Sequence, residues 1–414
     1  MIRLTHSLVV AGWLAIALAA SHAADTAPLA AVLQSAVDKH LVGGAVVLVA
    51  NKERGLDLEA AGYSSLSAQT PMKADSLFWI ASMSKSFTGT ALMMLVDEGK
   101  LKLDDPVEKY LPEFKGQMVE EDSIERHPPR HPITVREVMD HTSGVVTPQD
   151  PAFKGKTTLQ EIVEVIGKSP LHREPGTKYE YNNQGINTGG RLIEVLSGVP
   201  YADFMQQRLF TPLELKDTTF FPTEEQGARL ANTAKFMADK TSLEDVGFRK
   251  QLPAALSEKL SHGQKIPEAL LDNFGGGVIP DLVNHYAQPA GGLYSTAGDV
   301  GRFCQMLLNG GTWQGRRYLS AEALKQLSTN QTGDVPVNPD EGYGVGWSVK
   351  IKNNEGSDVG SYGHRGARRT AMWIDPKDDL VMVVMIQRMD MSGEQQKEFY
   401  GSVFRAMVEK FGRK

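Results

Sequence analysis

The segments with β-strand character lie at the two ends of this chain, and helices and loops occupy the middle. Near the amino terminus, "GGAVVLVANK" and "LDLEAAGYSS" are rich in β-favouring residues and are separated by a charged turn, which predicts an antiparallel pair. Near the carboxyl terminus, "GYGVGWSVKI", "AMWIDP" and "LVMVVMIQ" predict three further strands. Amphipathic patterns at residues 27–41 and 398–411 predict a helix beside each group. One antiparallel sheet built from both ends of the chain, packed by these helices, satisfies the pattern.

The middle of the chain, from about residue 100 to 290, is predicted to be helical and rich in loops. "TVREVMDHTSG" begins with Thr134 and Glu137 at the spacing of a capping box, and "LQEIVEVIGKS" and "GGRLIEVLSG" are amphipathic. We therefore expect an α+β fold, with an α/β sandwich formed by residues 24–99 and 290–414 and a mostly helical insertion at 100–289. A cleft is expected between the two parts.

The first residues have the pattern of a secretory signal. "MIRLTHSLVVAGWLAIALAASHAADTAP" places one cation before an apolar run from Leu8 to Ala20, followed by the small residues Ser21 and Ala23. The apolar run is shorter than the roughly 20 residues that a membrane-spanning helix needs. The sequence predicts that residues 1–23 are removed and that the mature chain begins near Ala24, in the periplasm or outside the cell.

The stretch "FWIASMSKSFTGTALMMLVDEGKL", residues 78–101, places Ser82 and Lys85 three positions apart at the start of a predicted helix. Apolar residues cover all sides of that helix, so it is expected to be buried. A serine hydroxyl is a weak nucleophile that needs a base within reach, and a lysine becomes a base when burial lowers its pKa. The S-x-x-K pattern is common by chance, so its meaning depends on the rest of the chain.

Two further motifs follow in the chain. "PGTKYEYNNQG" contains Tyr181 and Asn183, and "YGHRGARRTAMWIDP" contains His364 and Gly366. The order S-x-x-K, Y-x-N and H-x-G resembles the serine β-lactamase and penicillin-binding-protein superfamily. "GKLKLDDPVEKYLPEF", "HTSGV", "PAGGLYSTAGDVGRF" and "GYGVGWSV" are similar to its class C β-lactamase-like branch, and "HRGARRTAMWIDPKDDL" looks closest to the family VIII carboxylesterases. The resemblance covers nearly all of the mature chain and implies the β-lactamase/transpeptidase-like fold.

The resemblance also implies a role for each motif residue. Ser82 attacks the substrate carbonyl and becomes acylated, while Lys85 and Tyr181 share the proton transfers. Asn183 is expected to hydrogen-bond Lys85 or the substrate. The resemblance places the oxyanion hole at two backbone N–H groups, those of Ser82 and Ala367. Which of Lys85 and Tyr181 is the general base stays open at this point.

The third motif departs from that of a β-lactamase. Where such an enzyme carries Lys-Thr-Gly, this chain has His364, Arg365 and Gly366, so a fixed ammonium is replaced by a group that is mostly neutral at pH 7. Arg365, Arg368 and Arg369 add positive charge beside the expected cleft. They either recognise a substrate carboxylate or form a solvated charged turn, and the sequence leaves both alternatives open.

Other classes of function receive little support. The net charge of −6, with no run of lysine or arginine, argues against nucleic acid or an anionic membrane as partner. Cys304 is the only cysteine, which excludes an internal disulfide, and it lies on the apolar side of a predicted helix. His127 and His131 flank two prolines, and no metal-ligand pattern appears. No cofactor or metal is expected, and the absence of a complete G-x-S-x-G argues against a nucleophile-elbow hydrolase.

These observations predict an exported, cofactor-independent serine hydrolase that cleaves carboxylic esters through an acyl-Ser82 intermediate. The first alternative is a β-lactamase or D-alanyl-D-alanine peptidase acting on a β-lactam or a peptide. An alternative of another class is a penicillin-binding sensor that is acylated without turnover. The natural substrate, the acyl-chain preference and the oligomeric state are not apparent from the sequence.

Overall fold

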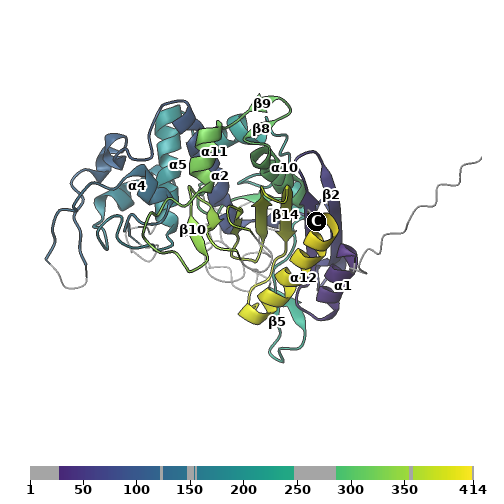
Figure 1. The fold of residues 1–414 in the computed structure, drawn as a ribbon. Coiled ribbons are helices and arrows are strands. Elements are labelled where there is room, and N and C mark those ends of the chain that lie inside the picture. The colour runs from purple at the N-terminus through teal and green to yellow at the C-terminus, as the bar shows by residue number, and fades with distance from the viewer. Residues whose placement is uncertain are drawn as a thin grey trace, which may run out of the picture.

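The fold is described from a computed structural model, which covers residues 28–121, 125–146, 153, 156–246, 286–353 and 358–412. The predicted signal, residues 1–23, lies outside these ranges. The chain forms an antiparallel sheet flanked by helices, with a helical part beside it (Figure 1). This arrangement confirms the predicted α+β fold.

The main sheet joins the two ends of the chain. β1 pairs with β2 on one side and with β14 on the other, and in the second pairing Val46 lies opposite Met385. Every neighbouring pair in the sheet is antiparallel. In spatial order, the sheet contains β10 (Glu341–Tyr343), β11 (Ser348–Lys350), β12 (Tyr362–Arg365), β13 (Ala371–Asp375), β14 (Leu380–Met385), β1 (Gly44–Ala50), β2 (Gly55–Ser65) and β3 (Thr70–Pro71).

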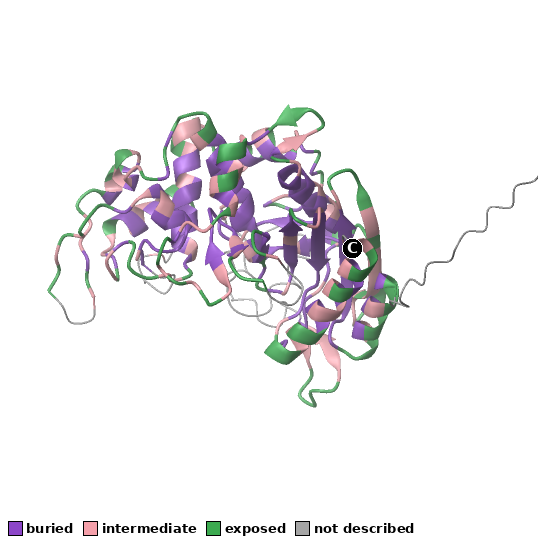
Figure 2. Cartoon of the chain, viewed as in Figure 1, coloured by how far each residue is buried: buried purple, intermediate pink, exposed green. Residues whose placement is uncertain are grey.

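Helices cover both faces of the sheet, so the central strands are buried on both sides. Side chains of a strand alternate between the faces. Val47 and Val49 join a cluster formed with α1 (Leu29–Asp38) and α12 (Gly393–Phe411), whereas Val46 and Leu48 join the larger core that includes α10 (Ala297–Leu308). Full burial of one such aliphatic side chain is worth roughly 1.5–3 kcal/mol, which explains why β1 and β14 are apolar at every position. Figure 2 shows this buried interior.

The helix predicted from the S-x-x-K stretch is α2 (Ser84–Asp97), which follows a short 3-10 turn, η1 (Ala81–Met83). Residues 84–95 are all buried, which confirms the prediction of a helix buried on all sides. Gly89 is required at its position because a Cβ atom there would lie 2.0 Å from the carbonyl oxygen of Val345. The helix packs against α5 (Asn183–Ser197) and α11 (Ala321–Ser328). The S-x-x-K stretch is therefore held in the interior by two helices from distant parts of the chain.

Short strand pairs also lie outside the main sheet. β4 (Phe78–Trp79) pairs with β7 (Tyr294–Ser295) and not with the main sheet. The part predicted to be helical contains a hairpin of β5 (Ala234–Phe236) and β6 (Leu243–Asp245). The buried guanidinium of Arg388 lies 4.3 Å from the ring of Phe236, so the hairpin is attached through a tertiary contact that local patterns do not reveal.

The remaining elements are short. Thr134 and Glu137 form the predicted capping box at the start of α3 (Val135–Met139).

Across the described ranges, none of the helices combines the length and the apolar character needed to cross a membrane. The other elements are η2 (Val107–Lys109), η3 (Pro112–Phe114), α4 (Leu159–Lys168), α6 (Tyr201–Met205), η5 (Gln206–Phe210), α7 (Glu224–Ala228), β8 (Thr312–Trp313) and β9 (Arg316–Arg317).

Candidate active site

Ser82 lies in the tight turn that leads into α2. The residue before it, Ala81, has a φ of +46°, a left-handed conformation that residues other than glycine rarely adopt. The Ser84 hydroxyl holds the turn, because it donates to the carbonyl of Ala81 at 2.6 Å and accepts the N–H of Leu293 at 3.1 Å. Backbone strain of this kind is typical of functional sites. Ser82 itself is partly exposed, so a substrate can reach its hydroxyl.

Lys85 is fully buried and contacts three uncharged oxygen atoms. Its Nζ lies 3.1 Å from the hydroxyl of Ser82, 2.7 Å from Oδ1 of Asn183 and 2.7 Å from the carbonyl oxygen of Ala290. Burial disfavours the ammonium form, and none of these three partners supplies a negative charge to offset it. The pKa of Lys85 is therefore well below its ordinary value of 10.5.

The contacts of Lys85 suit a base. A neutral amine has two N–H donors and one lone pair. The two shorter contacts, to Asn183 and Ala290, can take both donors, which leaves the lone pair for the hydroxyl proton of Ser82. A lysine in this arrangement can accept a proton from the serine directly.

Tyr181 and Asn183 come from the Y-x-N segment at the start of α5. Lys85 Nζ lies 4.7 Å from the centre of the Tyr181 ring. Although the residue Tyr181 is 46 % exposed, loss of hydration raises the pKa of its phenol, and a hydrogen bond with Ser82 opposes this effect without cancelling it. Between these two residues, Asn182 caps α5 by accepting the N–H of Gln184 at 2.7 Å. The cap therefore fixes the backbone that carries the side chains of Tyr181 and Asn183.

His364 lies on β12 and is buried within the site. Its Nδ1 is 2.8 Å from the carbonyl oxygen of Arg365, which can only accept, so Nδ1 carries the proton. Nε2 then accepts the hydroxyl of Tyr343 at 2.9 Å. Burial, with the nearby charge of Lys85, lowers the pKa of His364 to about 3. His364 is thus a neutral, fully engaged side chain and does not replace an ammonium.

Gly366 begins the turn between β12 and β13, and this turn packs on the segment that carries Ser82. Its N–H donates to the carbonyl of Thr370 at 2.8 Å. A Cβ atom at Gly366 would lie 2.1 Å from the Thr370 hydroxyl and 2.5 Å from the carbonyl oxygen of Ile80. The close approach at Gly366 is thus made to the protein's own backbone, two residues before Ser82. Ala367, next in the turn, is exposed at the same edge.

The family model described as Beta-lactamase matches residues 29–403, which is most of the chain. The chain belongs to the beta-lactamase family. Its members are serine hydrolases, and this membership confirms the predicted superfamily and the β-lactamase/transpeptidase-like fold.

Several proteins are similar to this chain along most of their length. Protein Rv1367c of Mycobacterium tuberculosis is 28% identical over 383 residues, which cover 86% of this chain and 88% of that one. A putative D-alanyl-D-alanine carboxypeptidase of Escherichia coli is 26% identical over 338 residues, covering 78% of this chain and 71% of the other. Among solved structures, the hydrolase EstCE1, described as having promiscuous acyltransferase activity, superposes with a TM-score of 0.71 at 22% identity, over 91% of this chain and 97% of that one. At this identity the last comparison shows the fold alone.

The three arginines predicted to bind substrate do not lie together. The Arg365 guanidinium lies 5.1 Å from the ring of Tyr400 on α12, and Arg369 contacts Gln396 of the same helix. Both side chains therefore lie against α12. For Arg365 this direction agrees with the alternation of side chains along β12, because His364 points the other way. Arg368 differs, since its guanidinium lies 5.4 Å from the ring of Trp79. Trp79 donates to the carbonyl of Gly291, the residue after Ala290, whose own carbonyl contacts Lys85.

Three residues at this beta-lactamase-family site were missed as individual functional residues. Ala290 supplies a backbone carbonyl to Lys85, Tyr343 holds His364, and the ring of His141 lies 4.6 Å from those of Tyr181 and Tyr343. The segments that contain them, "PAGGLYSTAGDVGRF", "GYGVGWSV" and "HTSGV", are typical of the family. Their individual roles depend on contacts between distant segments, which no local spacing reveals.

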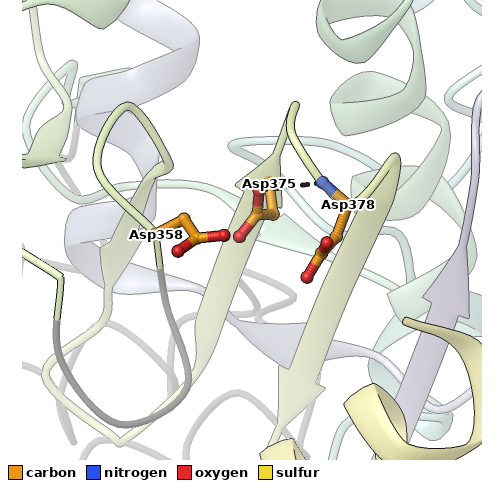
Figure 3. Close-up of side chains that lie close together, drawn as sticks. All are labelled: Asp358, Asp375 and Asp378. Carbon is orange, nitrogen blue, oxygen red and sulfur yellow. Dashed lines mark hydrogen bonds between the residues drawn. The ribbon is translucent and has the colours of Figure 1, made fainter. Parts of the chain in front are cut away.

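One acidic cluster lies apart from this site. Asp358, Asp375 and Asp378 bring oxygen atoms within 4.8 Å of one another and form the one such group of potential metal ligands among the described residues (Figure 3). The Lys377 ammonium lies 2.7 Å from Asp358, and Asp375 accepts the backbone N–H groups of Lys377 and Asp378. These contacts already offset much of the charge of the cluster. It lies at the end of β13 away from the Gly366 turn and takes no part in the chemistry of Ser82.

Cys304 is fully buried in α10, with its sulfur 3.8 Å from that of Met372. Burial raises the pKa of its thiol, which disfavours the reactive thiolate. The prediction that Cys304 belongs to the core is confirmed.

Proposed function

We propose that this chain is an exported serine hydrolase that cleaves carboxylic esters through an acyl-Ser82 intermediate. The observation that carries the proposal is the environment of Lys85, a buried lysine whose hydrogen-bond partners are two neutral acceptors and the Ser82 hydroxyl. A charged lysine with a purely structural role would need a negative partner at such a position, to offset the free-energy cost of burying its ammonium. A neutral lysine that accepts a proton from serine has no such requirement.

The proposed reaction begins when Lys85 takes the hydroxyl proton of Ser82 as the oxygen attacks the ester carbonyl. The bond from Ser82 Oγ to the carbonyl carbon forms, and the carbonyl oxygen takes up negative charge. The N–H groups of Ser82 and Ala367 stabilise that oxyanion. The tetrahedral intermediate collapses with loss of the alkoxide, which leaves an ester on Ser82. Water then repeats the sequence at the acyl carbon and releases the acid.

The pKa shifts suggest how Lys85 and Tyr181 divide the proton transfers. The pKa of Lys85 is lowered, which favours its neutral, basic form, and the pKa of the Tyr181 phenol is raised, which favours its protonated form. Lys85 therefore acts as the general base toward Ser82. Tyr181 acts as the general acid that protonates the departing alkoxide, and the proton on Lys85 replaces the one that Tyr181 gives up.

Esters are favoured as substrates because the site lacks the ammonium that Lys-Thr-Gly provides. His364 is neutral, and both of its ring nitrogens are occupied by Arg365 and Tyr343. A substrate carboxylate, which β-lactams and D-alanyl peptides carry, would find no cation at this position. Neutral esters carry no carboxylate and therefore need no cation at this position.

Cleavage of D-alanyl peptides is the second candidate, and Arg368 is the observation that favours it. Arg368 is buried beside Trp79, next to the segment that supplies the carbonyl contacting Lys85. A guanidinium there could bind a terminal carboxylate. If it does, Arg368→Gln raises KM for an acidic substrate far more than for a neutral ester. Arg365→Gln, which alters the α12 side, is the matched control, and equal effects of the two variants count against this candidate.

A substrate panel tests the proposal. Turnover of p-nitrophenyl butyrate, nitrocefin and a D-Ala-D-Ala peptide would be measured for the wild type and for Ser82→Ala, with intact-protein mass spectrometry to detect the acyl group. We expect ester turnover that Ser82→Ala abolishes. Retained turnover in Ser82→Ala would overturn the acyl-Ser82 mechanism, and a stoichiometric burst without turnover would identify the non-turnover sensor. Export is tested separately by cell fractionation, in which deletion of residues 1–23 should keep the protein in the cytoplasm.

A further inference from the structure

His141 follows the short helix α3 and is buried against the Y-x-N segment. Its side chain is 2% exposed, and its backbone has a φ of +69°. A histidine in this left-handed conformation costs conformational energy that the surrounding contacts must offset. Its position is therefore determined by those contacts and not by local preference.

The backbone on both sides of Tyr181 is bound to His141. The N–H of Glu180, the residue before Tyr181, donates to the backbone carbonyl of His141 at 2.8 Å. The N–H of Asn182, the residue after Tyr181, donates to Nδ1 of the His141 side chain at 3.2 Å. One residue thus holds the chain immediately before and immediately after the proposed general acid.

The His141 ring also fills the space between two tyrosines. It lies 4.6 Å from the ring of Tyr181 at a tilt of 46°, and 4.6 Å from the ring of Tyr343 at a tilt of 57°. Tyr343 in turn donates to His364 on β12. His141 therefore connects the Tyr181 segment with the strand that forms the other side of the site.

His141 must be neutral to accept this hydrogen bond. Because Nδ1 accepts from Asn182, the single proton of the neutral ring is on Nε2. Nε2 is buried without a hydrogen-bond partner in the described part of the chain, so only Nδ1 has an assigned polar contact. Burial, followed by the nearby charge of Lys85, lowers the pKa of His141, which keeps Nδ1 available as an acceptor.

We propose that His141 is a positioning residue that holds the Tyr181 phenol at the distance from which it protonates the leaving group. This inference rests on the proposed function, because it assigns His141 an effect only through Tyr181. If the inference is correct, replacing His141 reduces activity most on the substrates whose cleavage depends most on Tyr181. A substrate with a good leaving group, such as a p-nitrophenyl ester, needs little protonation, whereas an ethyl ester depends on it.

Three variants separate the contributions of His141. His141→Phe keeps an aromatic ring and removes the acceptor. His141→Gly removes the ring and the acceptor but relieves the backbone strain, so it is informative if the Phe variant does not fold. His141→Asn places an amide oxygen near the position of Nδ1 and tolerates the left-handed backbone. Circular dichroism and thermal unfolding establish that each variant is folded.

The readout is kcat/KM for ethyl butyrate and for p-nitrophenyl butyrate, in the wild-type and Tyr181→Phe backgrounds. We expect His141→Phe and His141→Gly to lose about 10- to 100-fold on the ethyl ester and much less on the p-nitrophenyl ester. His141→Asn should retain most of the activity on both. In the Tyr181→Phe background, each change should cost less than about twofold, because the residue through which it acts is gone.

Each contrary result has a distinct meaning. Equal losses on the two esters, or the same loss in the Tyr181→Phe background, would show that His141 acts only on general stability and would overturn the inference. If Tyr181→Phe impairs ethyl ester cleavage but none of the folded His141 variants does, the inference fails and the proposed function stands. If Tyr181→Phe itself leaves both esters unaffected, the proposed role of Tyr181 fails and the inference fails with it.

Discussion

Nζ of Lys85 lies 2.7 Å from Oδ1 of Asn183, a residue 98 positions further along the chain. The amide oxygen accepts a hydrogen bond and carries no formal charge, so it orients the amine without the stabilisation of the ammonium that a carboxylate would supply. The basicity of Lys85 therefore depends on the neutrality of its partner as much as on burial.

Replacing Asn183 by aspartate tests this dependence. The carboxylate of Asn183→Asp would favour the ammonium form of Lys85 and raise the pKa of Lys85. At a pH below that pKa, each unit of the rise lowers the fraction of neutral Lys85 by about tenfold. The acid limb of the kcat/KM profile for p-nitrophenyl butyrate should shift to higher pH. Asn183→Ala, which removes the contact without adding charge, should lower activity with no upward shift. Superimposable pH profiles for the two variants would refute the prediction.

The depressed pKa of Lys85 also predicts how stability varies with pH. Its folded-state pKa lies well below the ordinary 10.5, so between these two values the unfolded chain binds more protons than the folded chain. The free energy of unfolding therefore gains from this group as pH rises through that window, by up to about 1.4 kcal/mol per pH unit. Urea denaturation at several alkaline pH values should show a steeper rise for the wild type than for Lys85→Met. Parallel slopes would contradict a depressed pKa.

Gly366→Ala should destabilise the protein and displace the turn beside Ser82. The added Cβ would lie 2.1 Å from the Thr370 hydroxyl and 2.5 Å from the carbonyl of Ile80, so backbone must move. Overpacking of this kind costs about 1–3 kcal/mol. Gly393→Ala is the matched control. Gly393 is the first residue of α12, and no atom lies within 4 Å of a Cβ added there. Thermal unfolding together with kcat measures both effects, and equal behaviour of the two variants would refute the close packing.

Tyr181→Phe should reveal the general acid through the leaving group. Without the phenol, the departing alkoxide of ethyl butyrate has no proton donor, and kcat/KM should fall by about 100-fold or more. The stable p-nitrophenolate needs no such proton, so cleavage of p-nitrophenyl butyrate should fall far less. The ratio of the two rate constants is the measurement. An unchanged ratio would show that a group other than Tyr181 acts as the general acid.

The sequence predicted the large elements because their causes are local. Apart from Lys85, residues 84–95 are apolar or small on every side, which indicates a buried helix, and the capping box at Thr134 and Glu137 marks the start of α3. The pairing of β4 with β7 and the hairpin of β5 and β6 were not predicted. Short strands that pair with distant partners carry too little local pattern to indicate those partners.

The arginine-rich turn also shows which features of the site the sequence could predict and which it could not. The sequence placed Arg365, Arg368 and Arg369 beside the expected cleft, but it could not indicate the direction of each side chain. In the structure Arg365 and Arg369 lie against α12, and Arg368 alone lies beside Trp79. The direction depends on the end of β12 and on the shape of the turn that follows it.

By itself, the sequence determined the family, the sheet built from both ends of the chain, and the identity of Ser82, Lys85, Tyr181 and Asn183 as candidates. These follow from motif order and local periodicity, which are properties of the chain. Only the tertiary structure decided how the candidates are tuned. The carbonyl of Ala290 meets Lys85 and the ring of His141 meets Tyr181 because distant segments pack together, and the burial that lowers the pKa of Lys85 exists only once they have done so.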